Sequence, residues 1–242
     1  MPTSFIDLHC HWVAGIDDGA RSHAEGRAML VRLGEIGFSR VIATPHMRPG
    51  LFDNQRAELQ AAYQRALEAL GGDPTLPELG LSCEHYFDDV VYGRLLAGEG
   101  LPYPGGRAVL LEFYDQELPL TLTRQLFELS RRGLRAVIAH PERYRRIWED
   151  PDTLERLVDS GAVALLDVAS LAGKYGRAPR ESAELLLERG LYQAACSDAH
   201  RPADVDEVAR GIELVRARYG DDEVTFLLRE GPLQILEGRV EA

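Results

Sequence analysis

Seven short runs of apolar and β-branched residues alternate along the chain with segments of helical periodicity, and this alternation most constrains the fold. The runs occupy residues 5–11, 40–46, 79–84, 108–113, 134–141, 163–168 and 193–197. Largely apolar runs of this length are typical of parallel strands that are buried on both sides. The sequence therefore predicts an α/β protein built on a parallel sheet.

The segments between these runs predict amphipathic helices. After the first run, Ser22 and Glu25 stand at capping-box spacing, and Met29, Leu30 and Leu33 follow at helical intervals. Further helices are expected over 53–70, 120–132, 151–160, 181–189 and from 204 onward with a break near 220–221. Since no linker or repeat divides the chain, we expect a single domain over residues 1–242.

Polar residues stand at or just after the C-terminal ends of the runs. They are His9 and His11, His46, Glu84, Glu112, His140, and Asp198 with His200. Barrel enzymes build their sites at this face, whereas an open doubly wound sheet would spread the same residues too widely to meet. We therefore expect a TIM-like (β/α)7 barrel, one unit short of the eightfold pattern, with the open sheet as the alternative.

The polar residues at the strand ends are the donors that metal ions prefer. Five of the seven histidines end a run, and His9 and His11 point the same way because side chains alternate along a strand. The candidate metal ligands are His9, His11, Asp18, His46, Glu84, Glu112, His140, Asp198 and His200. These nitrogen and oxygen donors are too many for one ion and suit two or three ions of manganese, iron, zinc, cobalt or magnesium. The alternative is a coincidental set of buried histidines.

The charge of such a centre indicates its substrate. Three divalent ions against four carboxylates leave about +2, which favours an anion such as a phosphate monoester. Arginine binds phosphoryl oxygens through a planar fork of donors. We therefore expect Arg143, three residues after His140, and Arg201, directly after His200, to contact the substrate, with Arg48 as a weaker candidate.

Composition limits the partners and the compartment. The formal net charge of -12 and the pI of about 5.1 argue against nucleic acid and anionic membranes. We expect no signal peptide and no bilayer-spanning segment, because no apolar stretch has the required length or flanks. The three cysteines, Cys10, Cys83 and Cys196, form no paired pattern, so a reducing cytoplasm is the expected compartment.

Seven motifs together resemble the polymerase and histidinol phosphatase (PHP) superfamily. They are Asp7-Leu-His-Cys-His11 with Gly15-Ile-Asp-Asp-Gly19, Ile42-Ala-Thr-Pro-His46, Glu84, Leu111-Glu112-Phe113, Val137-Ile-Ala-His-Pro-Glu-Arg143, Ser170-Leu-Ala-Gly173 and Cys196-Ser-Asp-Ala-His200. Their order and the chain length are similar to those of the capsule-type bacterial tyrosine phosphatases of that superfamily, which depend on manganese. The resemblance extends from Phe5 to about Arg201.

The resemblance implies a distorted barrel with a trinuclear site, in which the nine residues above are ligands and Glu84 and Asp198 are the bridges. It also implies a substrate, phosphotyrosine on a membrane-associated kinase that controls exopolysaccharide or capsule synthesis. An aryl phosphate suits the chain, because a phenolate leaves with little protonation. The two remaining candidates for an acid are unconvincing: Asp17 is expected to orient a ligand, and His85 to be structural.

Two departures from the family pattern and two alternative functions stay open. Val205 occupies the region where family members often carry a further active-site arginine, so Arg201 either replaces it or the contact is missing. The end of the sixth run, residues 167–170, is also less polar than a substrate-facing loop is expected to be, and Asp167 and Ser170 either face the pocket or serve to cap and pack. The alternative functions are a small-molecule phosphatase of histidinol-phosphate type or another PHP phosphoesterase, and a non-catalytic interaction domain that metals stabilise.

Overall fold

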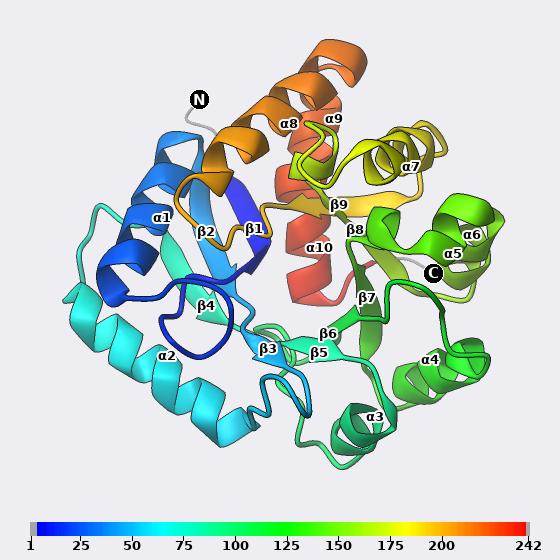
Figure 1. Cartoon of the computed structure of the whole chain (residues 1–242), viewed down its shortest axis with the longest axis horizontal. Helices are drawn as coiled ribbons and strands as arrows, with labels where there is room; N and C mark the ends of the chain where they lie inside the picture. Colours follow the sequence, from blue (N-terminus) through cyan, green and yellow to red (C-terminus); the bar gives the residue numbers. More distant parts are fainter. Residues whose placement is uncertain (1–3, 241–242) are drawn as a thin grey trace.

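The computed structural model describes residues 4–240, and its strands form a ring surrounded by helices (Figure 1). The strands are β1 Phe5–Cys10, β2 Phe38–Ala43, β3 His46–Met47, β4 Glu78–Leu81, β5 Glu84–Tyr86, β6 Ala108–Glu112, β7 Arg135–Ala139, β8 Val163–Asp167 and β9 Tyr192–Cys196. Their orders are β1-β2-β4 in one sheet and β3-β5-β6-β7-β8-β9 in the other, and every pair is parallel. The predicted α/β class is confirmed.

The two sheets join into one barrel. Strand β2 continues into β3 and β4 into β5, so two of the seven predicted runs are each divided in two. Pro45, between β2 and β3, has no N–H to donate to a ladder, which explains the first interruption. The ring closes where Cys10 at the end of β1 bridges to Ala199, just after β9. The barrel prediction is thus confirmed, including its distortion, and the open-sheet alternative is wrong.

Most of the helices cover the outside of this barrel, whereas the last one closes one of its ends (Figure 1). The helices are α1 His23–Glu35, α2 Arg56–Leu70, α3 Asp89–Leu96, α4 Leu122–Arg131, α5 Arg145–Glu149, α6 Asp152–Asp159, α7 Arg177–Glu188, α8 Asp204–Tyr219, α9 Asp221–Thr225 and α10 Gly231–Glu237. Short 3-10 turns at Pro141–Arg143 and Val168–Ser170 and a π segment at Phe226–Glu230 complete the set. Within the described residues, no helix has the length and apolar character that crossing a bilayer requires.

Some helix boundaries differ from the prediction for local reasons. The α1 cap is as predicted, since the Ser22 hydroxyl accepts a hydrogen bond from the Glu25 amide at 3.2 Å. Helix α7 begins at Arg177 rather than at 181, and Pro179 is accommodated because the first turn needs no intrahelical N–H donor. Helix α3 was not predicted, and its signal was the Asp88 cap, whose side chain accepts from the Val91 amide at 2.7 Å.

Apolar side chains fill the barrel from its N-terminal end. Leu8, Ile42, Leu110 and neighbouring strand residues form the inner cluster, together with Ile235 and Leu236 of α10. Figure 1 shows α10, in red, in the middle of the ring of strands. Each fully buried leucine or isoleucine contributes about 2 kcal/mol to stability. Because one end of the barrel is closed in this way, the C-terminal ends of the strands are left for polar chemistry.

Candidate metal centre

The strand ends bring all nine predicted ligands to one place. Their donor atoms form four overlapping groups, within each of which the atoms lie no more than 4.8 Å apart. The groups are His11, Asp18, His46 and His200; His9, His11 and Glu84; His9, His140 and Asp198; and His46, Glu84 and Glu112. Since His9, His11, His46 and Glu84 each belong to two groups, the cluster is continuous.

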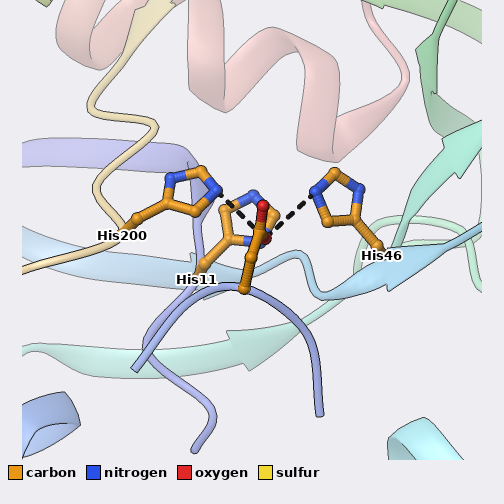
Figure 2. A group of neighbouring side chains, drawn as sticks. His11, His46 and His200 are labelled. Atoms are coloured by element: carbon orange, nitrogen blue, oxygen red, sulfur yellow. Dashed lines mark ion pairs between the residues drawn. The ribbon is translucent and has the colours of Figure 1, made fainter. Parts of the chain in front are cut away.

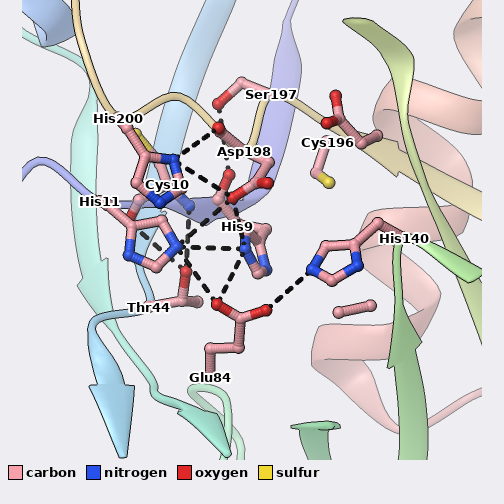
Figure 3. Close-up of polar contacts among 12 residues, drawn as sticks. His9, Cys10, His11, Thr44, Glu84, His140, Cys196, Ser197, Asp198 and His200 are labelled. Carbon is pink, nitrogen blue, oxygen red and sulfur yellow. Dashed lines mark hydrogen bonds and ion pairs between the residues drawn. The ribbon is translucent and has the colours of Figure 1, made fainter. Parts of the chain in front are cut away.

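The Glu84 carboxylate contacts several imidazoles of the cluster, and Figure 3 shows it reaching His9, His11 and His140. Its Oε1 is 3.0 Å from Nε2 of His140. Its Oε2 lies 3.4 Å from Nε2 of His9, 3.3 Å from Nε2 of His11 and 3.1 Å from Nδ1 of His46. Since β5 lies between β3 and β6 in the sheet, a single carboxylate at its start reaches ligands from several strands.

Asp18 completes the outer, more exposed side of the cluster. Nε2 of His46 and Nε2 of His200 are each 3.4 Å from its Oδ1, and Figure 2 shows the two rings approaching one point from opposite sides. The turn that carries Asp18 packs tightly on β1, since a Cβ on Gly19 would lie 2.2 Å from the carbonyl oxygen of His11. Only glycine allows this approach, which explains the glycine next to the acidic pair.

Asp17 contacts the ring nitrogen of His11 that does not face the cluster. Its Oδ2 lies 2.8 Å from Nδ1 of His11 and accepts from the His46 amide at 3.1 Å, while its Oδ1 accepts from the Gly19 amide at 2.8 Å. A carboxylate on one ring nitrogen fixes the tautomer and leaves the other nitrogen free to bind a metal. The geometry agrees with the expectation that Asp17 orients a ligand.

Two cluster residues hold strained backbone conformations. His140 has φ of 34° and Asp198 has φ of 42°, and they are the non-glycine residues with positive φ in the described part of the chain. Such conformations cost about 1–3 kcal/mol each and persist where the surroundings dictate them. His140 directly follows β7 and Asp198 lies two residues after the end of β9, and at both positions the strained backbone directs the side chain into the cluster.

Unsatisfied polar atoms show that the cluster fits metal ions. Among the described residues, several buried atoms without a hydrogen-bond partner belong to it, namely Nδ1 of His9 and His140 and Oε2 of Glu112. Buried polar atoms are normally paired, because each unpaired one costs about 1–3 kcal/mol. Nitrogen and oxygen donors gathered without thiolates suit hard to borderline divalent cations. The residues present therefore fit the group that the sequence predicts.

Neighbouring charges shift the pKa values of the carboxylates in the cluster. Burial alone would raise the pKa of Glu84, but His9 and His46 hold that pKa well below its usual range. In the same way, Arg143 and His9 outweigh burial and lower the pKa of Asp198. Burial and the nearby charge of Glu84 raise the pKa of Glu112 to about 7. Without cations, one carboxylate of the cluster thus tends to hold a proton.

Arg143 lies beside the cluster, as predicted for a substrate contact. Its Nη2 donates to Asp167 Oδ2 at 2.5 Å and also to the carboxylate of Asp198. The same nitrogen donates to the Tyr175 hydroxyl at 2.9 Å, and the guanidinium carbon stands 3.8 Å from the centre of the Tyr175 ring. Asp167 therefore faces this pocket and holds the arginine in place.

Arg201 has a different set of contacts. Its Nη1 donates to the carbonyl oxygens of Gly19 and His200, the latter at 2.7 Å, and its Nε is 3.8 Å from Glu25. These bonds fasten the Asp18 turn to the segment after β9. Val205 is buried in the core and offers no cationic group at the mouth. The role of Arg201 as a substrate contact stays a prediction.

Two supporting residues were not predicted as part of the site. Tyr175 stacks on Arg143, and its only sequence signal is the pair of nearby glycines, Gly173 and Gly176. Glu142 is fully buried, and its Oε1 accepts from the Asp167 amide at 3.0 Å and from the Ser170 hydroxyl at 2.9 Å. Ser170 thus packs rather than facing the substrate, and both bonds tie the turn bearing Arg143 to the end of β8.

His85 is structural, as its position on the opposite strand face predicts. Its Nδ1 donates to the Leu110 carbonyl at 2.9 Å and its Nε2 accepts from the Leu101 amide at 3.1 Å. Burial lowers the pKa of His85 to about 4, which keeps the ring neutral and able to accept.

We expect His85→Ala to lower the free energy of unfolding by about 2–4 kcal/mol, because it removes two buried hydrogen bonds and leaves a cavity. Urea unfolding of the metal-free protein measures the loss, with the exposed His23→Ala as the matched control. The metal content of the folded variant should equal that of the wild type. A loss below about 1 kcal/mol, or a lower metal content, would contradict the structural role.

A closed α/β barrel whose strand ends gather imidazoles and carboxylates has the architecture of metal-dependent barrel hydrolases. The sequence profile described as "Capsular polysaccharide synthesis, CpsB/CapC" matches residues 5–237. The tyrosine-protein phosphatase YwqE of Bacillus subtilis is 33% identical over 200 residues, which cover 81% of this chain and 77% of YwqE. The chain belongs to the CpsB/CapC family, as its resemblance to the capsule-type phosphatases predicts.

Further comparisons agree with this assignment. The tyrosine-protein phosphatase CpsB of Streptococcus pneumoniae is 23% identical over 240 residues, covering 96% of this chain and 98% of CpsB. A crystal structure whose description names YwqE from Bacillus subtilis and CpsB from Streptococcus pneumoniae as unique metal-dependent tyrosine phosphatases is similar to this chain, with a TM-score of 0.89 at 27% identity. The match covers 98% of this chain and 96% of that structure. The phosphotriesterase homology protein of Escherichia coli shares the fold, with a TM-score of 0.62 at 14% identity and coverage of 97% and 99%.

Proposed function

We propose that this chain is a metal-dependent protein-tyrosine phosphatase that acts on a bacterial tyrosine kinase controlling capsule or exopolysaccharide synthesis. The observation that carries the proposal is the convergence of nine nitrogen and oxygen donors around Glu84, next to Arg143. Membership of the CpsB/CapC family and the names of the relatives support the same reaction.

The proposed ligands are the nine residues of the cluster, with Glu84 and Asp198 bridging neighbouring ions. The central place of Glu84 supports its bridging role, since its two oxygens face four different imidazoles. Mn²⁺ is the proposed ion, because oxygen and imidazole donors without thiolate suit it. Bound divalent ions would polarise the phosphoryl group and activate water as a nucleophile near neutral pH.

The side chains of this chain have defined tasks in that reaction. Asp17 holds His11 in one tautomer, and Asp167 and Tyr175 hold Arg143 where its remaining donors would meet phosphoryl oxygens. Fixed donors of this kind stabilise the charge that develops in phosphoryl transfer. The leaving tyrosinate, with a pKa near 10 for its conjugate acid, needs little help from a general acid.

The site is open enough for a tyrosine on a protein surface. The Asp18 side chain is 54% exposed and that of His200 is 25% exposed, so the outer ligands border solvent directly. The proposed partner is a membrane-associated tyrosine kinase, and the proposed compartment is the cytoplasm. The three cysteines, all free and buried, agree with a reducing environment.

The proposal is tested by comparing two phosphate esters. We expect Mn²⁺-loaded protein to release phosphate from a phosphotyrosine peptide with kcat/KM at least about 100-fold above that for histidinol phosphate, since the latter lacks an aryl leaving group. A preference for histidinol phosphate would favour the small-molecule alternative. No turnover of either ester with manganese, cobalt or iron would refute catalysis and leave the non-catalytic interaction domain.

A further inference from the structure

Three arginines stand near the mouth of the cluster, and they differ in what their guanidinium groups contact. Arg143 donates to two carboxylates and a hydroxyl, and Arg201 donates to two backbone carbonyls. The guanidinium of Arg48 makes no hydrogen bond or ion pair with any residue between 4 and 240. It lies instead on the ring of Tyr86, with its central carbon 4.2 Å from the ring centre. All the donors of Arg48 are therefore available to a ligand.

The contact with Tyr86 places the Arg48 guanidinium next to the cluster. His46 pairs with Glu84, and Tyr86 pairs with Glu112. Because alternate residues of a strand share a face, Tyr86 lies on the same side of β5 as Glu84, and the Arg48 guanidinium lies on the Tyr86 ring. A phosphate ester that rested on the cluster would lie near Glu112 and Tyr86, and hence within reach of the Arg48 guanidinium.

The loop that bears Arg48 is built onto one of the candidate ligands. The Arg48 amide donates to the Phe52 carbonyl at 2.9 Å, and the Phe52 amide donates back to the Arg48 carbonyl at 2.8 Å. The Phe52 ring stacks on the His46 ring with centres 5.4 Å apart and planes 8° apart. Asn54 Nδ2 donates to the His46 carbonyl at 2.9 Å. The Arg48 backbone is therefore held in place relative to His46, and only its side chain has to adjust to a ligand.

Arg48 and Arg143 follow strands on different sides of the barrel mouth. Arg48 follows β3 and Arg143 follows β7, and these strands are separated by β5 and β6 in the sheet. A phosphate monoester has three non-bridging oxygens and a charge near -2 at neutral pH, which is more than one guanidinium fork can cover. Two forks from two sides would hold it in one orientation.

We propose that Arg48, supported by the Tyr86 ring, is a second phosphoryl-binding residue of this site. It binds the phosphate from the side opposite Arg143. This inference rests on the proposed phosphatase function and adds a substrate contact to it. The recognised group is the phosphate itself, so the effect of Arg48 has to appear with any aryl phosphate, with or without a peptide attached.

The test compares Arg48→Ala and Arg48→Lys with the wild type on p-nitrophenyl phosphate and on a phosphotyrosine peptide. We expect Arg48→Ala to lower kcat/KM about 10- to 100-fold for both substrates, because the variant loses a charged hydrogen-bonded contact to the phosphate. Arg48→Lys should recover only part, because lysine keeps the charge but loses the fork. Calorimetry with inorganic phosphate and Mn²⁺-loaded protein should show affinity about tenfold weaker in Arg48→Ala.

Arg124→Ala, on the exposed face of α4, is the matched control and should change none of these values beyond about twofold. The inference is wrong if Arg48→Ala leaves both kcat/KM values and the phosphate affinity within that range. It is equally wrong if only the peptide reaction suffers, since Arg48 would then bind residues flanking the tyrosine. Failure of the proposed function looks different: the wild type would hydrolyse neither ester, and the phosphate affinities would still decide the role of Arg48.

Discussion

Asp198→Asn is expected to lower kcat/KM for a phosphotyrosine peptide about a thousandfold, which corresponds to about 4 kcal/mol of transition-state stabilisation. Asp198 Oδ1 lies 2.7 Å from Nε2 of His9, and its other oxygen accepts from Arg143. The carboxylate therefore joins the candidate ligands to the arginine proposed to bind phosphate, and an amide has neither its charge nor its two acceptor oxygens.

Asparagine is the right replacement here because it tolerates the positive φ of this position, where alanine would add backbone strain. The initial-rate assay should be paired with thermal unfolding to show that the variant folds. Asp222→Asn, an exposed carboxylate on α9, is the control and should keep full activity. An Asp198→Asn protein that retains more than about a tenth of wild-type activity would rule out a bridging ligand role.

Removal of the metal ions should have the second large effect. We expect a chelator to abolish phosphatase activity and to lower Tm by at least about 5 °C, because each site saturated at 100 times its Kd adds about 2.7 kcal/mol. Mn²⁺ should restore both. Differential scanning calorimetry and a metal titration of the activity measure the two effects together.

The affinity for Mn²⁺ should also rise from pH 6 to pH 8. Although burial alone would lower it, the carboxylates of Glu84 and Asp198 raise the pKa of His9 to about 10 in the ion-free cluster. The ring then holds a proton that a cation has to displace, so binding releases protons and weakens as pH falls.

His140→Ala should lose part of the thermal shift, whereas the exposed His23→Ala should keep all of it. A chelated protein with unchanged Tm and unchanged activity would mean that the cluster binds no ion. An unchanged Tm with lost activity would limit the ions to a catalytic role.

Short-range patterns accounted for much of the fold. The seven apolar runs became the strands of the barrel, and Ser22 caps α1 as its spacing predicts. Pro45 even carried the signal for the break between β2 and β3, since a proline cannot donate to the ladder. The break between β4 and β5, at Ser82 and Cys83, had no such signal, because neither residue disfavours a strand.

Side-chain direction was the part that the chain order left open. Arg143 and Arg201 both follow a candidate ligand closely. The guanidinium of Arg143 donates to the Asp198 carboxylate, whereas that of Arg201 donates to backbone carbonyl oxygens. Arg48 is the weaker candidate in the sequence, but of these three arginines it is the one whose guanidinium makes no hydrogen bond or ion pair with the described residues. Position next to a ligand predicts which end of the barrel a residue occupies, and the neighbours that surround it then determine which way its guanidinium points.

The sequence by itself determined the β/α alternation, the kind of donors present and the barrel end at which they gather, because these follow from periodicities of two to four residues. Only the tertiary structure decided that Glu84 is the central carboxylate, that Asp17 supports His11 and that Tyr175 stacks on Arg143. Those pairings join residues that are distant along the chain or depend on how strand ends bend. They are settled by closure of the barrel, which brings the end of β1 against the segment after β9.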